Sequence, residues 1–283
     1  MKNILITGVS TGIGYGCTQA FLNSGYRVFG SVRKKEHAQK LQEEFGENFL
    51  PLVFDVTDHQ AIKKSAVEVE EMLKGATLDG LINNAGISVS GPVSHIPIDN
   101  FRKQFEVNFF GQIAVTQAFL PIMGMVNDFE GKAGRIVMMS SVSGRSTLPF
   151  MGPYSASKYA LEAISDALRR ELMAYGIDVV VIEPGPVKTA IWDKGDDKAI
   201  ESIKDTRYYG PVKKFSEFMM DLGANGIELD VFSQQVLKIF ESRNPKTRYV
   251  ITKDKLKNFT LPGLLPDKWV DAALGKMLGL KKE

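Results

Sequence analysis

Short apolar segments alternate along the chain with longer segments in which apolar residues recur every three or four positions. The short segments are rich in Val, Ile, Leu and Phe, as is typical of strands buried on both faces of a parallel sheet. The predicted strands are 3–7, 26–32, 49–54, 78–82, 136–140, 177–182 and 248–252. The predicted helices are 13–23, 35–45, 59–73, 99–123, 154–172, 211–222 and 229–241. This alternation predicts an α/β fold.

Two segments depart from the alternation. Residues 191–209 are polar and poorly periodic, and we interpret them as part of a mobile substrate lid over about 187–225. Residues 254–283 contain Leu-Pro-Gly-Leu-Leu-Pro and then an amphipathic helix. The apolar face of that helix consists of Trp269, Val270, Ala273, Leu274, Met277 and Leu278. This face can cover the substrate pocket, pack on a partner subunit or lie on a membrane surface, and packing on the protein is expected. We predict one large domain over 1–253 and a C-terminal tail over 254–283.

Length and composition narrow the class of protein. The chain has 283 residues, 44% hydrophobic and 24% charged, which fits one large α/β domain with a sizeable core. The net charge of +2 is scattered, so no basic face indicates a nucleic-acid partner. The start lacks the apolar stretch of a signal peptide, and no apolar run approaches the ~20 residues of a membrane span. A single cysteine, Cys17, excludes an internal disulfide and fits a cytoplasmic protein. The histidines show no pattern of a metal site.

The stretch from Ser141 to Lys158 contains the first candidate site. Tyr154 and Lys158 are four residues apart in a predicted helix and therefore share one face. An ammonium group beside a phenol favours the phenolate, so we expect the pKa of Tyr154 to fall from about 10 toward working pH. Ser141 follows a predicted strand, and its hydroxyl can donate to a carbonyl oxygen held beside the tyrosine. This set suits carbonyl reduction or alcohol oxidation. The alternative is an ordinary helix-surface pair, since Tyr-x-x-x-Lys is common.

A glycine-rich turn joins the first predicted strand to the first predicted helix. Glycine allows the backbone to approach a pyrophosphate, and a helix N-terminus offers free N–H groups and partial positive charge. The spacing is Gly-x-x-x-Gly-x-Gly, which differs from the Gly-x-Gly-x-x-Gly of other dinucleotide folds. The residues expected to contact the cofactor are Gly8, Ser10, Thr11, Gly12, Ile13 and Gly14. The alternative is a turn that only connects strand to helix.

The end of the second predicted strand indicates which cofactor binds. A carboxylate there would bind the ribose hydroxyls of NAD. Val32 occupies that position, and Arg33 follows it with two lysines. A basic cluster without a carboxylate can accommodate a 2′-phosphate and form an ion pair with it, so the sequence favours NADP(H) over NAD(H). The alternative is that Arg33 is a solvated residue at a helix start.

Three other strand ends carry candidate cofactor contacts. Asp55 and Val56 follow the third strand, where an acid could bind the adenine amino group or simply form a turn. The fourth strand leads into Asn84, Ala85 and Gly86, which can pack on a ribose and tie neighbouring strands together. A loop with Pro184, Gly185, Val187 and Thr189 leaves the sixth strand and lies over the crevice in such folds.

Asn108 lies in the middle of the predicted helix 99–123, where asparagine is unfavourable. Its presence requires a local helix distortion, a buried hydrogen bond or a bound water.

Together these motifs resemble the short-chain dehydrogenase/reductase family. The resemblance covers roughly residues 3–190 and rests on Thr7-Gly8-Val-Ser-Thr-Gly12-Ile-Gly14, Asn83-Asn84-Ala85-Gly86, Asn108, Ser141, Tyr154, Lys158 and Pro184-Gly185. It implies one Rossmann-type domain with a doubly wound, seven-stranded parallel sheet. It also implies that Tyr154 transfers the proton while Ser141 orients the substrate. Lys158 then lowers the tyrosine pKa and holds the nicotinamide ribose, and Asn108 holds a water in a proton relay.

Within the family, the sequence from Tyr154 to Glu162 and around Ile182-Glu183-Pro184-Gly185 is similar to the branch of retinol and 17β-hydroxysteroid dehydrogenases. That likeness suggests an apolar ketone, aldehyde or secondary alcohol that is steroid-, retinoid- or lipid-like. Thr11 replaces a basic residue that some NADP-using members carry in the glycine turn. The resemblance also suggests a homodimer or homotetramer that pairs through the helices of Asn108 and Tyr154.

We therefore expect an NADP(H)-dependent oxidoreductase. The alternatives are an NAD-dependent alcohol dehydrogenase of the same family and a non-catalytic sensor that only binds cofactor. The sensor is disfavoured because all four candidate catalytic residues are present: Ser141, Tyr154, Lys158 and Asn108.

Overall fold

Seven parallel strands form one sheet in the order β3-β2-β1-β4-β5-β6-β7. The computed structural model describes residues 1–126, 130–189 and 200–280. The strands are β1 Asn3–Thr7, β2 Arg27–Val32, β3 Phe49–Val53, β4 Gly80–Asn83, β5 Arg135–Met139, β6 Asp178–Pro184 and β7 Arg248–Ile251. From β1 the chain adds β2 and β3 on one side and then returns to add β4 and the later strands on the other side. The strand order therefore reverses between β1 and β4, which is where ligands bind in such open sheets. The predicted doubly wound, seven-stranded parallel sheet is confirmed.

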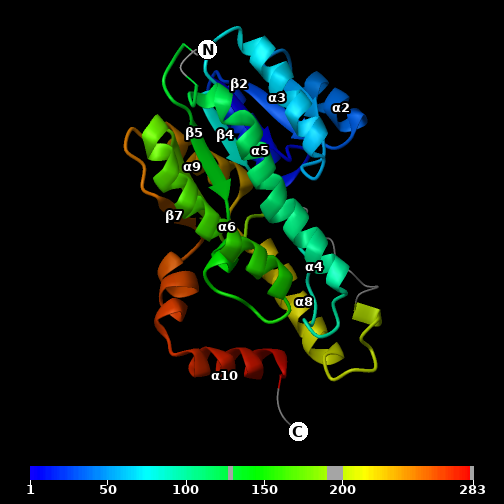
Figure 1. The fold of residues 1–283 in the computed structure, drawn as a ribbon. Coiled ribbons are helices and arrows are strands. Elements are labelled where there is room, and N and C mark those ends of the chain that lie inside the picture. The colour runs from blue at the N-terminus through cyan, green and yellow to red at the C-terminus, as the bar shows by residue number, and fades with distance from the viewer. Residues whose placement is uncertain (127–129, 190–199, 281–283) are drawn as a thin grey trace.

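Helices cover both faces of the sheet (Figure 1). They are α1 Gly12–Asn23, α2 Lys35–Phe45, α3 His59–Leu73, α4 Ile98–Phe105, α5 Gly111–Phe119, α6 Gly152–Glu171, α8 Tyr209–Ala224, α9 Leu229–Glu241 and α10 Asp267–Leu278. Alternate residues of β1 point to opposite faces: Ile4 and Ile6 join the core that α1 and α9 cover, whereas Leu5 joins the core under α3, α5 and α6. Burial on both faces explains why the strands are continuous apolar runs.

The prediction of a single helix over 99–123 is wrong in one respect. The structure interrupts it with a π-helical segment at Glu106–Phe110, between α4 and α5, and ends it with a 3₁₀ turn at Pro121–Met123. Asn108 lies in the π-helical segment and is fully buried. The helix is therefore distorted at Asn108, a residue type with low helix propensity. Such π-helical segments often occur at functional sites.

The lid predicted over 187–225 is only partly visible, because 190–199 lie outside the described residues. Within the described part, α8 occupies 209–224, and Val187 pairs with Ile227 in an isolated bridge. Beyond β7 the chain passes through Leu256–Leu264 to α10, at the end of the molecule farthest from α2 and α3 (Figure 1). None of the helices in the described residues is long and apolar enough to cross a bilayer.

Candidate active site

The candidate catalytic residues come together at the carboxyl end of β5. Ser141 follows this strand and begins a 3₁₀ turn over Val142–Gly144, and α6 begins at Gly152 with Pro153 in its first turn. Proline suits this position because it lacks an N–H that the helix start would leave unpaired. Tyr154 and Lys158 therefore lie one turn apart near the start of α6, as the sequence predicts.

Ser141 is held in an extended conformation that directs its hydroxyl toward α6. Its φ is −168° and its ψ is 158°, and its Oγ accepts a hydrogen bond of 3.0 Å from the Ser143 N–H. A hydrogen bond also joins the Ser141 and Tyr154 side chains. The two hydroxyl groups are therefore neighbours in the candidate site.

The predicted fall in the pKa of Tyr154 is wrong for this structure. Burial of the phenol raises its pKa, and the hydrogen bond with Ser141 only partly opposes that rise. The Lys158 ammonium group donates a hydrogen bond of 2.7 Å to the Met139 carbonyl. The Lys158 Nζ lies 5.8 Å from the centre of the tyrosine ring. The protonated phenol is therefore favoured.

Lys158 is itself strongly affected by its surroundings. The side chain is buried, and burial lowers its pKa to about 8, although the negative charge of Glu162 opposes this change. Glu162 lies one helical turn further along α6. The protein therefore holds a cation beside the tyrosine whose charge depends on a neighbouring carboxylate.

Asn108 links the site to the loop after β4. Its Oδ1 accepts a hydrogen bond of 2.8 Å from the Ile87 N–H, while its Nδ2 donates to the Ile87 carbonyl at 3.0 Å and to the Ser157 hydroxyl at 3.3 Å. Of the three explanations for an asparagine at this position, the structure shows a helix distortion and buried hydrogen bonds. Ser157, which the sequence analysis did not identify, joins Asn108 to α6 (its Oγ also donates to the Tyr154 carbonyl at 2.7 Å).

The glycine turn has the geometry of a phosphate cradle. Gly8 and Gly12 have φ values of 71° and 63°, which favour glycine. A Cβ at Gly14 would overlap the Gly8 carbonyl oxygen and lie 2.5 Å from Asn84 Nδ2. Thr11 is the N-cap residue of α1, and in the described structure its side chain makes no capping hydrogen bond. The first turn of α1 contains no acidic residue. Ser10 and Ile13 lie in the same turn. These residues fit the pyrophosphate of a dinucleotide cofactor.

The ends of β1 and β4 are tied together beside this cradle, as predicted. Asn84 Nδ2 donates to the Thr7 carbonyl at 2.9 Å and to the Gly8 carbonyl at 3.2 Å. The Thr7 hydroxyl accepts from the N–H groups of Asn84 and Ala85 at 2.9 and 3.0 Å. Gly86 follows, and a Cβ on it would lie 3.3 Å from Asn108 Oδ1. One hydrogen-bonded unit therefore connects the glycine turn to the region of Asn108.

Of the candidate contacts at the other strand ends, some lie near the cradle and others have local partners. Thr189 is next to Gly12, since a Cβ on that glycine would lie 3.7 Å from the threonine side chain. Pro184 is buried at the end of β6, and in the loop that follows Gly185 is partly buried and Val187 is buried. Asp55 accepts hydrogen bonds from the Thr57 N–H at 3.0 Å and hydroxyl at 2.8 Å, as its turn interpretation expects.

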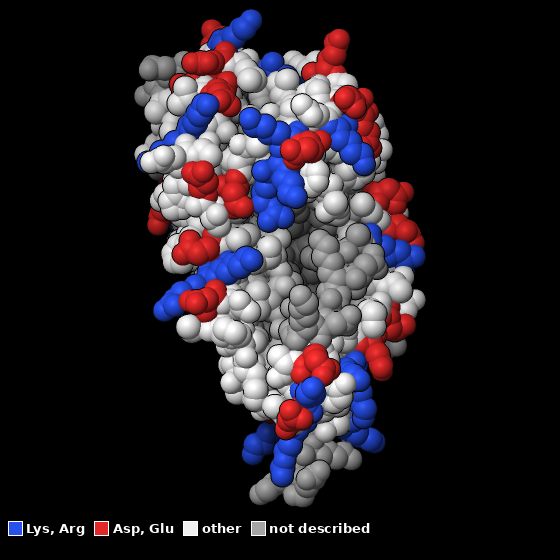
Figure 2. Space-filling view, turned by 90° about the vertical axis from the view of Figure 1, so that its right-hand side faces the viewer, with Lys and Arg blue, Asp and Glu red and all other residues white. Residues whose placement is uncertain are grey.

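Two candidate cofactor contacts, which follow the ends of β2 and β3, differ in exposure. Arg33 is exposed at the end of β2, directly after buried Val32, and Val56 is buried after β3. Figure 2 shows the hollow in the molecular surface with Lys and Arg side chains along one rim. Contacts of Arg33 and Val56 with the adenosine end of a dinucleotide stay a prediction.

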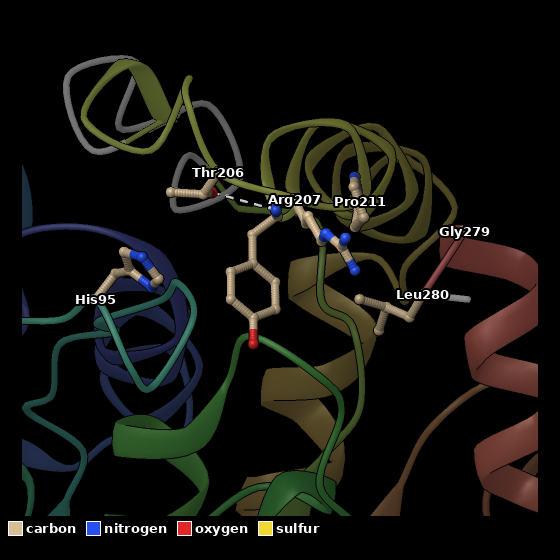
Figure 3. A pocket seen from close by; sticks show the side chains of 7 residues that line it. His95, Thr206, Arg207, Pro211, Gly279 and Leu280 are labelled. Carbon is tan, nitrogen blue, oxygen red and sulfur yellow. Dashed lines mark hydrogen bonds between the residues drawn. The ribbon is translucent and has the colours of Figure 1, made fainter. Parts of the chain in front are cut away.

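A cavity of about 450 Å³ lies between the loop of His95, the start of α8 and the end of α10 (Figure 3). It is lined by His95, Thr206, Arg207, Tyr208, Pro211, Gly279 and Leu280. Residues 206–211 belong to the predicted lid segment, and Gly279 and Leu280 show that the tail also lines the cavity. One apolar cluster contains Tyr208 and Leu280 together with Phe150, Met151 and Tyr154. The cavity and Tyr154 therefore share an apolar wall.

A charged cluster around the buried Glu162 and Glu183 side chains has no signal in the sequence, because its members lie far apart along the chain. Arg248 Nε lies 2.8 Å from Glu162 and its Nη2 lies 3.0 Å from Asp166. Glu183 is fully buried, with Arg145 at 3.5 Å and Arg248 at 3.7 Å. Burial raises the pKa of Glu183. This cluster joins α6 to β6, β7 and the segment that carries Ser141.

Comparison with known proteins places this architecture in a family. The short chain dehydrogenase family model matches residues 2–199. The NADPH-dependent 3-dehydrocapnine reductase of Ornithobacterium rhinotracheale is 40% identical over 278 residues, which cover 98% of each chain.

Two solved structures are also similar over nearly the whole chain. A short-chain dehydrogenase from Streptomyces avermitilis has a TM-score of 0.76 at 26% identity, covering 99% of this chain and 98% of that one. The closed form of a serine dehydrogenase complexed with NADP⁺ has a TM-score of 0.69 at 25% identity, covering 88% and 94%. Since the family model and the full-length relative agree with the site geometry, the chain belongs to the short-chain dehydrogenases and is an oxidoreductase of that type.

Proposed function

We propose that the protein is an NADPH-dependent reductase of a ketone on an apolar, lipid-like substrate. The observation that carries this proposal is the hydrogen-bonded pair of Ser141 and Tyr154, beside a glycine cradle and at the end of an apolar wall. The full-length similarity to an NADPH-dependent 3-dehydrocapnine reductase supports both the cofactor and the reduction of a ketone.

The chemistry divides between cofactor and protein. A bound nicotinamide cofactor would supply the hydride. Tyr154 would donate its phenolic proton to the substrate oxygen, and Ser141 would donate a hydrogen bond to that oxygen. Lys158 would hold the nicotinamide ribose and stabilise the tyrosinate left after proton transfer, while Asn108 would support a water in the proton relay. These roles follow from the family likeness.

The raised pKa of Tyr154 favours reduction over the alternative of alcohol oxidation. A phenol that stays protonated at neutral pH is ready to act as a general acid. Oxidation would instead require the phenolate as a base.

Cofactor choice rests on the end of β2. Arg33 is exposed at this end and β2 ends in Val32, so a 2′-phosphate would gain a cationic partner and meet no carboxylate. Gly12, Gly14 and Thr189 would hold the phosphates, and the loop of Asn84 would contact the ribose.

We also propose that the protein forms a homodimer or homotetramer through the helices that carry Asn108 and Tyr154. Phe110 is 47% exposed on this side of the molecule. It lines a surface hollow of about 230 Å³ with Phe101, Arg102, Phe105 and Glu106. A second copy would cover these aromatic side chains.

The first test is oxidation of NADPH by the purified protein with a panel of carbonyls. The panel would contain small aldehydes, quinones, steroid ketones, retinal and long-chain ketones, each also assayed with NADH. We expect turnover of the bulky apolar ketones with NADPH. Turnover of small aldehydes alone would contradict the substrate class. Tight NADPH binding without turnover of any carbonyl or matching alcohol would favour the non-catalytic sensor.

A second prediction concerns pH. Replacing Glu162 by Gln is expected to move the alkaline limb of the pH profile of kcat/KM to lower pH. The active lysine must be a cation, so activity is present below the pKa of Lys158, about 8, and is lost above it. Glu162 raises that pKa, and its removal therefore brings the loss to lower pH. The remaining charges around position 162 are Arg248, Asp166 and Glu183.

Glu171→Gln is the matched control, because this residue is exposed on the same helix. An alkaline limb that moves equally in both variants, or in neither, would contradict the role given to Glu162.

A further inference from the structure

The C-terminal helix α10 has two apolar stripes on neighbouring faces. Val270, Leu274 and Leu278 follow one another at intervals of four residues; the first two are half-buried and Leu278 is buried. Trp269, Ala273 and Met277 form the second stripe, and all three are exposed. Packing on the protein therefore accounts for the first stripe but not for the exposed second one.

The first stripe attaches the tail to the substrate side of the molecule. Leu278 is 1% exposed and belongs to the apolar cluster that also contains Tyr154, Phe150 and Phe215 of α8. Leu280 lines the cavity that also contains His95 and Tyr208 (Figure 3). The tail is therefore a wall of the proposed substrate site, and the second stripe faces away from that wall.

The second stripe continues into the segment before α10. Of the 19 large hydrophobic side chains that are exposed in the described residues, six fall between 256 and 277, so they are concentrated in the tail. They are Leu256, Leu261, Leu264, Leu265, Trp269 and Met277. Leu264 is 75% exposed and Trp269 is 68% exposed. Contiguous exposed apolar side chains of this kind mark an interaction surface.

Lysines are interspersed with these apolar side chains. From residue 253 to 283 the sequence has seven lysines and four acidic residues, whereas the whole chain has 35 Lys and Arg against 33 Asp and Glu. The net positive charge of the protein therefore resides in the tail. Lys253, Lys255, Lys268 and Lys276 are exposed. Figure 2 shows Lys and Arg side chains at the end of the molecule where α10 lies.

We propose that the tail segment 256–277 docks the protein on an anionic lipid bilayer surface. Leucine and tryptophan side chains would enter the interface while the lysines contact anionic headgroups, which is how amphipathic helices lie on membranes. Tryptophan is favoured at that depth. Protein–protein interfaces are depleted in lysine, so a second copy of the chain fits this mixed surface less well. Docking would place the cavity next to the bilayer.

The test is co-sedimentation of the full chain with vesicles, without cofactor or substrate. One vesicle contains phosphatidylcholine alone, and the other contains equal parts of phosphatidylcholine and phosphatidylglycerol. We expect binding to the anionic vesicles, weaker binding to the neutral ones, and loss of binding at high salt. In a Trp192→Phe background, Trp269 emission should shift to shorter wavelength on vesicle addition.

Two pairs of substitutions separate the tail from general surface apolarity. Leu264→Ser with Trp269→Ser should lower the partition coefficient about tenfold or more. Val67→Ser with Met173→Ser is the matched control, because these side chains are 54% and 68% exposed elsewhere and should leave binding unchanged. Lys255→Gln with Lys268→Gln and Lys276→Gln keeps the apolar stripe and should remove only the preference for anionic vesicles.

Three outcomes would overturn the proposal: no sedimentation with either vesicle, equal losses in the tail and control variants, or tail-dependent self-association without lipid. The last outcome would assign the stripe to a second copy, and sedimentation velocity detects it. Because binding is measured without turnover, a failed reductase assay leaves this result interpretable.

Discussion

Replacement of Tyr154 by Phe is expected to lower kcat by about a hundredfold to ten thousandfold while leaving NADPH affinity nearly unchanged. The substitution removes only the phenolic hydroxyl, which is the proton donor and the partner of Ser141. The ring stays in the apolar cluster with Phe150 and Met151, so the fold and the pocket wall are preserved. Steady-state kinetics with the best ketone of the panel and a fluorescence titration with NADPH measure the two effects.

Tyr159→Phe is the matched control for this prediction. Tyr159 lies on the same helix and is 45% exposed, so loss of its hydroxyl should leave kcat near the wild-type value. Retained turnover in the Tyr154 variant would contradict the proton-transfer role. A parallel loss of NADPH affinity would instead assign the tyrosine to cofactor binding.

Replacement of Arg33 by Ala is expected to raise the KM for NADPH by about tenfold to a hundredfold and to leave the KM for NADH almost unchanged. The guanidinium at the end of β2 can contact the 2′-phosphate, which NADH lacks. A hydrogen bond to a charged group contributes about 1.5–3 kcal/mol, which sets the size of this effect. Kinetics with both cofactors at a saturating ketone concentration provide the comparison.

Lys40→Ala is a suitable control, because Lys40 is an exposed cation on α2 and lies further from the end of β2 in the sequence. It should change neither KM by more than about twofold, since surface charges are largely screened. Equal losses of NADPH and NADH binding in the Arg33 variant would refute the role of this residue in selecting NADP(H).

Local patterns predicted the secondary structure well, for reasons that are visible in particular elements. The helices α2 Lys35–Phe45 and α9 Leu229–Glu241 begin and end as predicted. Asp58 accepts hydrogen bonds from the N–H groups of Gln60 and Ala61, as expected of an N-cap. These features depend on neighbours in the sequence, so the sequence alone contains the necessary information.

The interruption at Asn108 shows where local patterns were insufficient. Apolar periodicity continues through 99–123 and predicts one helix, but the backbone widens into a π-helical segment around this asparagine. The partners that hold Asn108 are Ile87 and Ser157, which are distant in sequence. Residue type therefore indicated that something was unusual, and the contacts determined what it was.

The electrostatics of the active site could not be obtained from spacing. Four-residue spacing correctly placed Tyr154 and Lys158 on one helix face, yet the expected effect on the tyrosine pKa has the opposite direction. Burial of the phenol explains the difference. The charged cluster of Glu162, Glu183 and Arg248 was invisible for the same reason, because it joins α6, β6 and β7.

The sequence by itself determined the order of strands and helices, the glycine turn, the candidate catalytic residues and the amphipathic character of the tail helix, because each is a local pattern of residue types. Only the tertiary structure decided which distant groups surround Tyr154 and Lys158, that the tail forms part of the cavity wall, and which stripe of α10 remains exposed. Desolvation and charge interactions depend on distance in space, and residues 87, 108, 157, 183 and 248 become neighbours of the site only after the sheet has assembled.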